Sequence, residues 1–240
     1  LDAATQLKFR LGYAPGERYA LKEYLGSQGI PTEDMIEAGL LISGDEVPVP
    51  FDRFRDRVMF PIIDLRGRVI AFGGRALEKD AQAKYLNSPE TPLFHKGATL
   101  YNIAAARQAA HEGAQIIAVE GYIDVIAMVT AGFGGAVAPL GTALTEEHVR
   151  LLKRYAKRVV LAFDADAAGQ GAAERFYEWE QKYQVEVSVA RFPQGKDPGD
   201  LSVSDPDALA DAVQHALPFL GFRLNRVLNA ETSNLSRSVA

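Results

Sequence analysis

The sequence contains no cysteine, and this absence removes two kinds of site at once. Without cysteine the chain forms no disulfide and offers no thiolate ligands to zinc. We therefore expect no zinc in this chain. The absence also fits the reducing cytoplasm, where disulfides are rare and where we expect the protein to act.

Long hydrophobic runs are missing as well. A helix that spans a bilayer needs about 20 apolar residues in succession, and no run in the sequence approaches that length. No secretory signal pattern is visible, so we expect no membrane partner. The chain begins at Leu1 instead of methionine, which predicts a fragment of a longer protein, and its 240 residues suffice for one or two domains.

Net charge is negative overall but unevenly distributed. The formal charge of −5 at pH 7 argues by itself against a nucleic-acid partner. Residues 53–107, however, carry 10 basic and 5 acidic residues, a balance of +5, whereas residues 1–52 (4 basic, 9 acidic) and 108–240 (12 basic, 17 acidic) each balance at −5. We expect phosphate contacts in the basic segment, although a solvated surface of mixed charge would explain the charges equally well.

The first hundred residues predict a mixed α+β region. Residues 15–42 predict two short helices, the second beginning near Thr32. Val58–Ile63 and Val69–Phe72 predict the two strands of a hairpin with a glycine-containing loop of four residues. Residues 84–102 are rich in turn formers and predict irregular structure.

From about residue 103 onward, short apolar runs alternate with helical patterns. The predicted strands are 115–119, 135–138, 158–163 and 185–192. The predicted helices are 104–111, 122–131, 145–155 with Thr145 as its cap, 169–182, and more helices from Asp205. This alternation indicates an α/β fold with a parallel sheet covered on both faces. We place domain boundaries near residues 108 and 204, which divides the chain into 1–108, 109–204 and 205–240.

Carboxylates follow three of these strands at the point where each strand ends. They are Glu120 after the first strand, Asp164 and Asp166 after the third, and Asp197 and Asp200 after the fourth. In open α/β sheets, ligands bind beyond the carboxyl ends of the strands. Because unpaired like charges repel, such a group of acids predicts divalent cations that act on phosphates. Two or more Mg²⁺ or Mn²⁺ ions would suit phosphoryl transfer.

Each of these residues also has a structural interpretation. Asp166 could cap the following helix, Asp164 could lie in a turn, and Asp197 could begin a loop before Pro198. Asp124 could lie in the first turn of its helix, where an acid is favoured, or turn back to the strand ends.

Gly141 and Thr142 follow the second predicted strand at the same edge of the sheet. Their glycine is more typical of a tight turn than of a phosphate loop, because the sequence contains no G-x-x-x-x-G-K-[ST]. Whether either residue contacts a ligand stays open at this point.

Four segments taken together resemble a known domain. They read "VEGYIDVIAM", "APLGTALTEEHVRLL", "VVLAFDADAAGQGAA" and "GKDPGDL", and in this order they resemble the Toprim domain of primases, topoisomerases, nucleases and recombination-repair proteins. Upstream, "FDRFRDRVMFPIIDLRGRVIAFGGRAL" and "KYLNSPETPLFHKGATLYN" resemble the RNA polymerase core of DnaG-type bacterial primases. The resemblance covers nearly all of residues 1–205.

The resemblance implies a fold and an activity. The fold is a Toprim-type parallel sheet flanked by helices, preceded by a basic α+β subdomain and followed by a short helical tail. The activity is primase: a DNA-dependent RNA polymerase that makes short RNA primers on single-stranded DNA during replication, by two-metal nucleotidyl transfer. The alternatives are another Toprim enzyme, a nuclease or topoisomerase fragment, and a DNA-binding recombination module without enzymatic activity.

The resemblance also implies the site residues. The catalytic residues would be Glu120, Asp124, Asp164 and Asp166, and the metal ligands Glu120, Asp164, Asp166 and Asp197. The family's basic groove falls on Arg55, Arg57, Arg75, Lys84, Tyr85, Asn87 and Lys96. Tyr85 and Phe94 would either stack on bases or pack in the core.

Two positions depart from the family pattern. Ala165 stands where the family usually has glycine, and we expect little effect because both residues are small. Gly199 stands where the family often has a second aspartate, in a D-P-D motif. Asp200 could supply the missing carboxylate from the next position, so its role stays open.

The implied partners are a single-stranded DNA template, ribonucleoside triphosphates and the RNA primer. The resemblance places an N-terminal zinc-binding domain and a C-terminal domain that binds the replicative helicase outside this chain. We expect the core to be monomeric and to act at the replisome in the cytoplasm.

Overall fold

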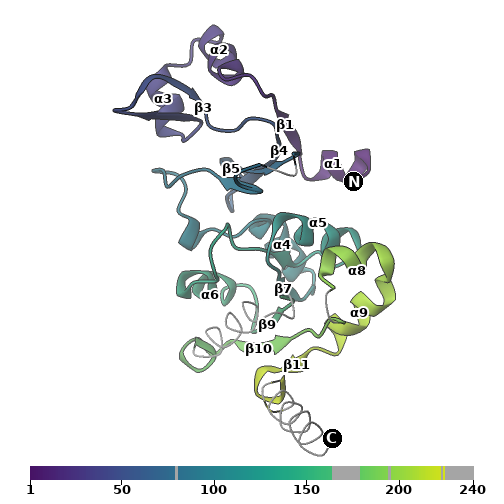
Figure 1. Cartoon of the computed structure of the whole chain (residues 1–240). Coiled ribbons are helices and arrows are strands. Elements are labelled where there is room, and N and C mark those ends of the chain that lie inside the picture. The colour runs from purple at the N-terminus through teal and green to yellow at the C-terminus, as the bar shows by residue number, and fades with distance from the viewer. Residues whose placement is uncertain (79–80, 164–178, 194–195, 223, 225–240) are drawn as a thin grey trace, which may run out of the picture. The chain divides into compact units, whose positions relative to one another are not determined.

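The computed structural model describes residues 1–78, 81–163, 179–193, 196–222 and 224. The chain divides into two compact units, which are described separately (Figure 1). The first unit comprises Leu1–Ala104 and Pro139–Ala143, and the second comprises Ala105–Ala138 and Leu144–Ala240. The three-part division expected from the sequence stays a prediction.

The first unit is built around a four-stranded antiparallel sheet in the order β1-β4-β5-β6. Its strands are β1 (Gly12–Ala14), β4 (Arg57–Ile63), β5 (Val69–Ala76) and β6 (Tyr85–Asn87). A separate antiparallel pair consists of β2 (Leu41–Gly44) and β3 (Val47–Asp52). The helices are α1 (Ala3–Lys8), α2 (Ala20–Ser27), α3 (Thr32–Glu37) and the 3₁₀ helix η1 (Lys96–Ala98), and α4 (Ile103–His111) follows.

The predicted hairpin is β4–β5, and one aspartate organises its loop. The Asp64 Oδ1 atom accepts hydrogen bonds of 2.9 Å from the backbone N–H groups of Arg66 and Arg68. The Asp64 Oδ2 atom accepts from Arg68 Nε at 2.8 Å. These hydrogen bonds, above all those from Arg68, lower the pKa of the Asp64 carboxyl. Gly67 has a φ of 81°, a conformation that glycine adopts without steric cost.

The structure confirms the two predicted helices as α2 and α3, but it corrects the prediction for the turn-rich segment. Residues Tyr85–Asn87 are not irregular; they form β6 and pair with Gly73–Arg75 of β5. This pairing is formed with a strand distant in sequence, so the local composition of turn formers did not reveal it. Phe94 is fully buried, which assigns it to the core and not to base stacking.

The second unit contains a five-stranded sheet in the order β11-β10-β9-β7-β8. Its strands are β7 (Ile116–Ala118), β8 (Ala136–Val137), β9 (Arg158–Leu161), β10 (Glu186–Val189) and β11 (Leu217–Pro218). Strands β7, β8, β9 and β10 run parallel to one another, which confirms the predicted α/β class.

Burial explains why these segments form strands. Ile116, Ile117, Val159 and Val160 are fully buried, and branched side chains favour extended backbone. Continuous burial along β7 and most of β9 and β10 is expected for a parallel sheet with both faces covered. The helices of this unit include α5 (Tyr122–Thr130), α6 (Glu146–Leu152), α8 (Pro198–Ser204) and α9 (Pro206–Gln214).

Thr145 caps α6, as predicted. Its Oγ1 atom accepts a hydrogen bond of 3.2 Å from the backbone N–H of His148, and its own N–H donates to His148 Nδ1 at 3.1 Å. The helix ends at Leu152, three residues before the predicted end at Tyr155.

For the C-terminal segment the sequence predicted only helices, but the structure also contains a strand. After α9, Leu217 and Pro218 form β11 and pair antiparallel with Val189 and Ser188 of β10. Arg158 of β9 supports this edge, because its Nε donates to Ser188 Oγ at 3.0 Å and its Nη2 donates to the Ala216 carbonyl at 3.3 Å.

The predicted helix 169–182 lies mainly outside the described residues, which resume at 179 with a helical turn. Among the helices that the structure describes, none combines the length and the apolar character needed to cross a bilayer.

Candidate functional site

Two of the predicted acids, Glu120 and Asp197, follow parallel strands of the sheet in the second unit. Strands β7, β9 and β10 are adjacent and parallel, as the prediction required. Glu120 follows β7 by two residues and is exposed. Asp164 and Asp166, predicted after β9, lie outside the described residues.

Asp124 lies in the first turn of α5, where the helix dipole favours an anion. Its Oδ2 atom accepts a hydrogen bond of 3.1 Å from the backbone N–H of Gly121. This bond satisfies one of the N–H groups left open at the start of the helix. The helix-start interpretation of Asp124 is therefore correct, and it does not exclude a role for the other oxygen.

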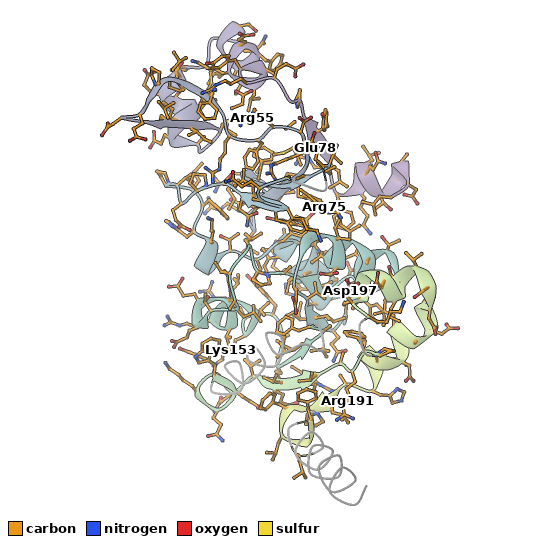
Figure 2. All side chains as sticks on the ribbon, viewed as in Figure 1. Arg55, Arg75, Glu78, Lys153, Arg191 and Asp197 are labelled. Atoms are coloured by element: carbon orange, nitrogen blue, oxygen red, sulfur yellow. The ribbon has the colours of Figure 1, made fainter. Side chains whose placement is uncertain are left out.

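Asp197 also occupies a helix start, that of α8. The Oδ1 atom of Asp197, a residue labelled in Figure 2, accepts a hydrogen bond of 2.6 Å from the Asp200 N–H. Pro198 follows in the first helical position. A methyl carbon built on Gly199 would lie 3.1 Å from Asp197 Oδ1 and 3.3 Å from Asp124 Oδ1. The structure thus brings Asp124 and Asp197 to the same space, in front of Gly199.

These residues suit a hard divalent cation. Carboxylate oxygens are the ligands that Mg²⁺ prefers, and the space in front of Gly199 is bounded by an oxygen of each aspartate. Across the residues that the structure describes, no three histidine, aspartate or glutamate side chains gather closely enough to form a complete metal site. A full ligand set would need Asp164 and Asp166, which stay predictions.

Two of the predicted basic residues lie on neighbouring strands of the first unit. Arg57 is on β4, Arg75 is on β5, and Arg75 pairs with Tyr85 at the start of β6. Lys84 immediately precedes β6, and its Nζ lies 5.8 Å from the centre of the Tyr85 ring. The sheet therefore gathers positive charges that are up to 27 positions apart in the sequence.

The guanidinium groups of Arg57 and Arg75 have few protein acceptors. Burial, together with the nearby charge of Arg55, lowers the pKa of Arg57. Arg57 Nη1 makes only long contacts, 3.4 Å to the Gly74 carbonyl and 3.5 Å to that of Lys84. The Nε of Arg75 is buried, and the described residues give it no hydrogen-bond partner (Figure 2). A buried donor without an acceptor is costly, so an anionic ligand would be stabilising there.

Arg53 has a structural role that the sequence did not single out. Its Nε and Nη2 atoms both donate to the Asn87 carbonyl, at 3.1 and 2.9 Å, and burial lowers its pKa. The only sequence signal was its place in the same arginine-rich run as Arg55 and Arg57.

Asn87 and Gly141, both predicted at the site, are close together. Gly141 has a φ of 72°, and a methyl carbon built there would lie 2.8 Å from Asn87 Nδ2. Glycine therefore provides both the turn and the room for the Asn87 amide. Thr142 is exposed beside it. Lys96 begins η1, and its N–H donates to Glu90 Oε1 at 2.9 Å.

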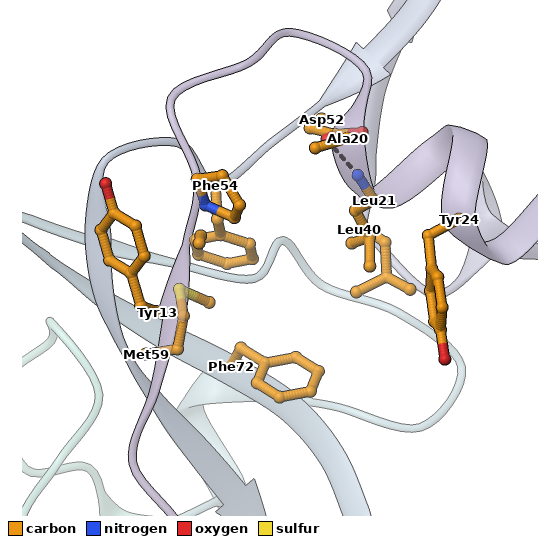
Figure 3. Close-up of a pocket in the computed structure, with 11 residues that line it drawn as sticks. Tyr13, Ala20, Leu21, Tyr24, Leu40, Asp52, Phe54, Met59 and Phe72 are labelled. Atoms are coloured by element: carbon orange, nitrogen blue, oxygen red, sulfur yellow. Dashed lines mark hydrogen bonds between the residues drawn. The ribbon is translucent and has the colours of Figure 1, made fainter.

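A cavity of about 320 Å³ in the first unit contains none of the predicted site residues (Figure 3). Its walls are mainly apolar and include Leu21, Phe54 and Phe72. Two of its polar side chains are engaged: Asp52 accepts from the Leu21 N–H at 2.7 Å, and the Tyr13 hydroxyl donates to Asp56. The cavity therefore lacks the groups that would recognise a phosphate.

In comparison with known proteins, the two halves of the chain match two different protein-family models. Residues 1–107 match the model of the DNA primase catalytic core, N-terminal domain, and residues 117–202 match a Toprim-like model. A DNA primase domain from Pseudomonas aeruginosa is 41% identical and superposes with a TM-score of 0.87, covering 96% of this chain and 73% of that one. The chain belongs to the bacterial DNA primase family.

Other primases agree with this assignment. The DNA primase of Clostridium acetobutylicum is 40% identical over 239 residues, which are 99% of this chain and 39% of that protein. The chain therefore spans about two fifths of this curated relative. A DnaG primase catalytic domain solved bound to single-stranded DNA is 38% identical, with a TM-score of 0.85, and the alignment covers 96% of this chain and 73% of that one. Toprim domains generally bind divalent metals, which fits the carboxylates at the edge of the sheet.

Proposed function

We propose that this chain is the RNA polymerase core of a primase and joins ribonucleotides into short RNA primers on a single-stranded DNA template. One observation carries the proposal: the chain combines a primase-type basic sheet with a Toprim-like sheet edged by carboxylates. Other Toprim enzymes and recombination modules are not expected to carry the first of these parts.

The acidic edge would hold the catalytic metal ions. Asp124 and Asp197, with Glu120 and the predicted Asp164 and Asp166, would bind two or more Mg²⁺ or Mn²⁺ ions. When bound, such ions neutralise triphosphate charge and favour the deprotonated 3′-hydroxyl of the primer. The backbone N–H groups of Gly121 and Asp200 hold the carboxylates of Asp124 and Asp197 in place, so little reorganisation is needed when a cation binds.

The basic sheet would hold nucleic-acid and nucleotide phosphates. Arg55, Arg57, Arg75 and Lys84 would contact phosphate oxygens without reading sequence. Tyr85, which is 40% exposed, is available to stack on a base.

The proposed partners follow from the same assignment. They are single-stranded DNA, ribonucleoside triphosphates and the growing RNA primer. Contact with the replicative helicase would depend on a separate C-terminal domain of the full-length primase. We propose that the core acts as a monomer at the replisome in the cytoplasm.

Template-dependent RNA synthesis tests the proposal. The purified chain is incubated with single-stranded DNA, labelled ribonucleotides and Mg²⁺ or Mn²⁺, and short RNA products are expected. Asp164→Ala should lower product formation by on the order of 10²-fold or more, because it removes a carboxylate that stabilises transition-state charge through the metal.

Asp211→Ala is the matched control, because Asp211 is an exposed acid on α9 outside the predicted site. It should leave the amount of RNA unchanged. Equal product from wild type and Asp164→Ala would contradict the assigned site. An absence of product from wild type at high protein concentration with Mn²⁺ would contradict the proposed activity.

A further inference from the structure

The start of α8 differs from the family pattern at one position that faces the acidic edge. Gly199 stands where the D-P-D motif carries its second aspartate. A side chain at this position would begin 3.1 Å from Asp197 Oδ1 and 3.3 Å from Asp124 Oδ1. Position 199 is therefore directed at the space that the two carboxylates share.

The surrounding structure holds this position in place. Asp197 and Pro198 begin α8, and α8 packs against α5, which carries Asp124. The hydrogen bond from the Gly121 N–H orients the Asp124 carboxylate. Both carboxylates are held from their own helix starts, and position 199 lies next to an oxygen of each.

Backbone conformation does not explain the glycine. Gly199 is not among the glycines with positive φ, so other residues can adopt its backbone conformation. Glycine also lowers helix stability relative to alanine. Glycine here avoids a tight contact, because a Cβ would lie 3.1 Å from Asp197 Oδ1 and 3.3 Å from Asp124 Oδ1 and would displace these oxygens slightly.

Asp200 does not replace the missing group. Asp200 is exposed, and its backbone N–H donates a hydrogen bond to Asp197 Oδ1. Successive residues of an α-helix are rotated by about 100° around the axis, so the side chain of Asp200 leaves α8 in a different direction from that of position 199.

We infer that Gly199 lowers the affinity of the site at Asp124 and Asp197 for a divalent cation. Glycine supplies no carboxylate at this position, so water takes the place of a charged ligand. The inference rests on the proposed function, because the cation belongs to that site. Divalent-cation affinity rises with the number of charged ligands and the rigidity of the site. A carboxylate at position 199 should therefore tighten cation binding.

Mn²⁺ titration of the purified chain, followed by electron paramagnetic resonance of the free ion, tests this directly. Gly199→Asp should bind Mn²⁺ roughly tenfold more tightly than wild type, since it adds a charged ligand. Gly199→Asn, which adds a neutral oxygen, should give a smaller gain. Gly199→Ala fills part of the space without a ligand and should give no gain.

Gly26→Asp is the charge-matched control. It adds the same negative charge on α2 at a glycine with open space around it. Its Mn²⁺ affinity should equal that of wild type. An equal gain from Gly26→Asp would show a general charge effect and would overturn the inference.

Thermal unfolding provides a second readout. Without metal, three neighbouring carboxylates repel, so Gly199→Asp should melt below wild type. Saturating Mn²⁺ should raise its melting temperature more than it raises that of wild type. If Gly199→Asp does not fold without metal, the Mn²⁺ affinities of Gly199→Asn and Gly199→Ala are compared instead. The inference is overturned if Gly199→Asn binds Mn²⁺ no more tightly than Gly199→Ala.

Neither readout contains template or ribonucleotides, so failure of the inference is distinct from failure of the proposed function. A chain that makes RNA while Gly199→Asp binds Mn²⁺ like wild type contradicts only the inference. Tighter binding by Gly199→Asp in a chain that makes no RNA contradicts only the proposed activity. Absence of Mn²⁺ binding in both wild type and Gly199→Asp also overturns the inference.

Discussion

Aspartates in this protein repeatedly accept hydrogen bonds from backbone N–H groups. Asp52, Asp64, Asp124 and Asp197 all do so. Such a residue has two oxygens, and the bond made by one oxygen fixes the direction of the other. At Asp124 this means that a structural bond and a proposed catalytic role occur in the same side chain, so truncating it would affect both.

Tyr13 illustrates how one neighbouring carboxylate shifts a titration. Its hydroxyl donates to Asp56 Oδ1 at 2.7 Å, and this bond is the main cause of its raised pKa, with a smaller contribution from the charge of Glu17. Because the folded-state pKa is raised, this contribution to stability is complete below about pH 10, the ordinary tyrosine value. It is lost as the pH rises through the folded-state pKa.

We predict that Asp56→Asn lowers the pKa of Tyr13 toward its ordinary value. Asn tolerates the φ of 49° at this position as Asp does, so the backbone should be retained. An NMR titration of the Tyr13 ring, assigned with Tyr13→Phe, measures the shift. Glu17→Gln should give a smaller decrease, and a decrease as large as that of Asp56→Asn would contradict the assignment.

At the scale of single elements, helix α2 depends on a residue outside itself. The start of α2 has no cap from its own N-cap residue, Tyr19. Asp52 at the end of β3 supplies the acceptors instead, with bonds of 2.7 Å from the Leu21 N–H and 3.0 Å from the Lys22 N–H. Asp52 is only 2% exposed, so water would not easily replace it.

Asp52→Ala should therefore lower the free energy of unfolding by about 2 kcal/mol, the upper end for loss of a helix cap. The local effect should be faster hydrogen exchange at the Leu21 and Lys22 amides. Asp52→Asn retains an acceptor and should cost less. Asp45→Ala, at an exposed acid between β2 and β3, is the control, and unchanged exchange in Asp52→Ala would contradict the capping role.

At the scale of the whole molecule, the uneven distribution of charge is the main reason to propose single-stranded DNA as a partner. The chain carries a net charge of −5, yet residues 53–107 carry 10 basic and 5 acidic residues, a balance of +5. A protein that neutralises phosphates releases counterions, so its affinity falls with salt in proportion to the number of contacts.

Lys84→Ala should weaken binding to single-stranded DNA and reduce the slope of log affinity against log salt by about one. Fluorescence anisotropy with a labelled oligonucleotide across a salt series measures both effects. Lys153→Ala removes an equal charge at an exposed position after α6 and should leave the slope unchanged. An unchanged slope in Lys84→Ala would make Lys84 an ordinary surface residue.

The sequence by itself determined the parallel sheet and the basic segment. Runs such as Ile116–Ala118 and Val159–Leu161 are apolar and rich in β-branched residues, and their alternation with helices leaves few other arrangements. Their ends, however, differ from prediction. The run predicted to extend to Phe163 pairs as β9 only to Leu161, opposite Ala118 and Val189, because a strand ends where its partners end.

Only the tertiary structure decided the features that depend on contacts between distant residues. Strand β6 forms because it pairs with the edge of β5, and β11 forms because it pairs with the edge of β10. Arg53 has the same chemistry as Arg57, yet its place beside the Asn87 carbonyl commits it to the fold. The importance of position 199 follows from the packing of α8 against α5, which places Gly199 next to Asp124. Local pattern specifies which segments pair or coil, whereas the partners of each side chain depend on packing between segments far apart in the chain.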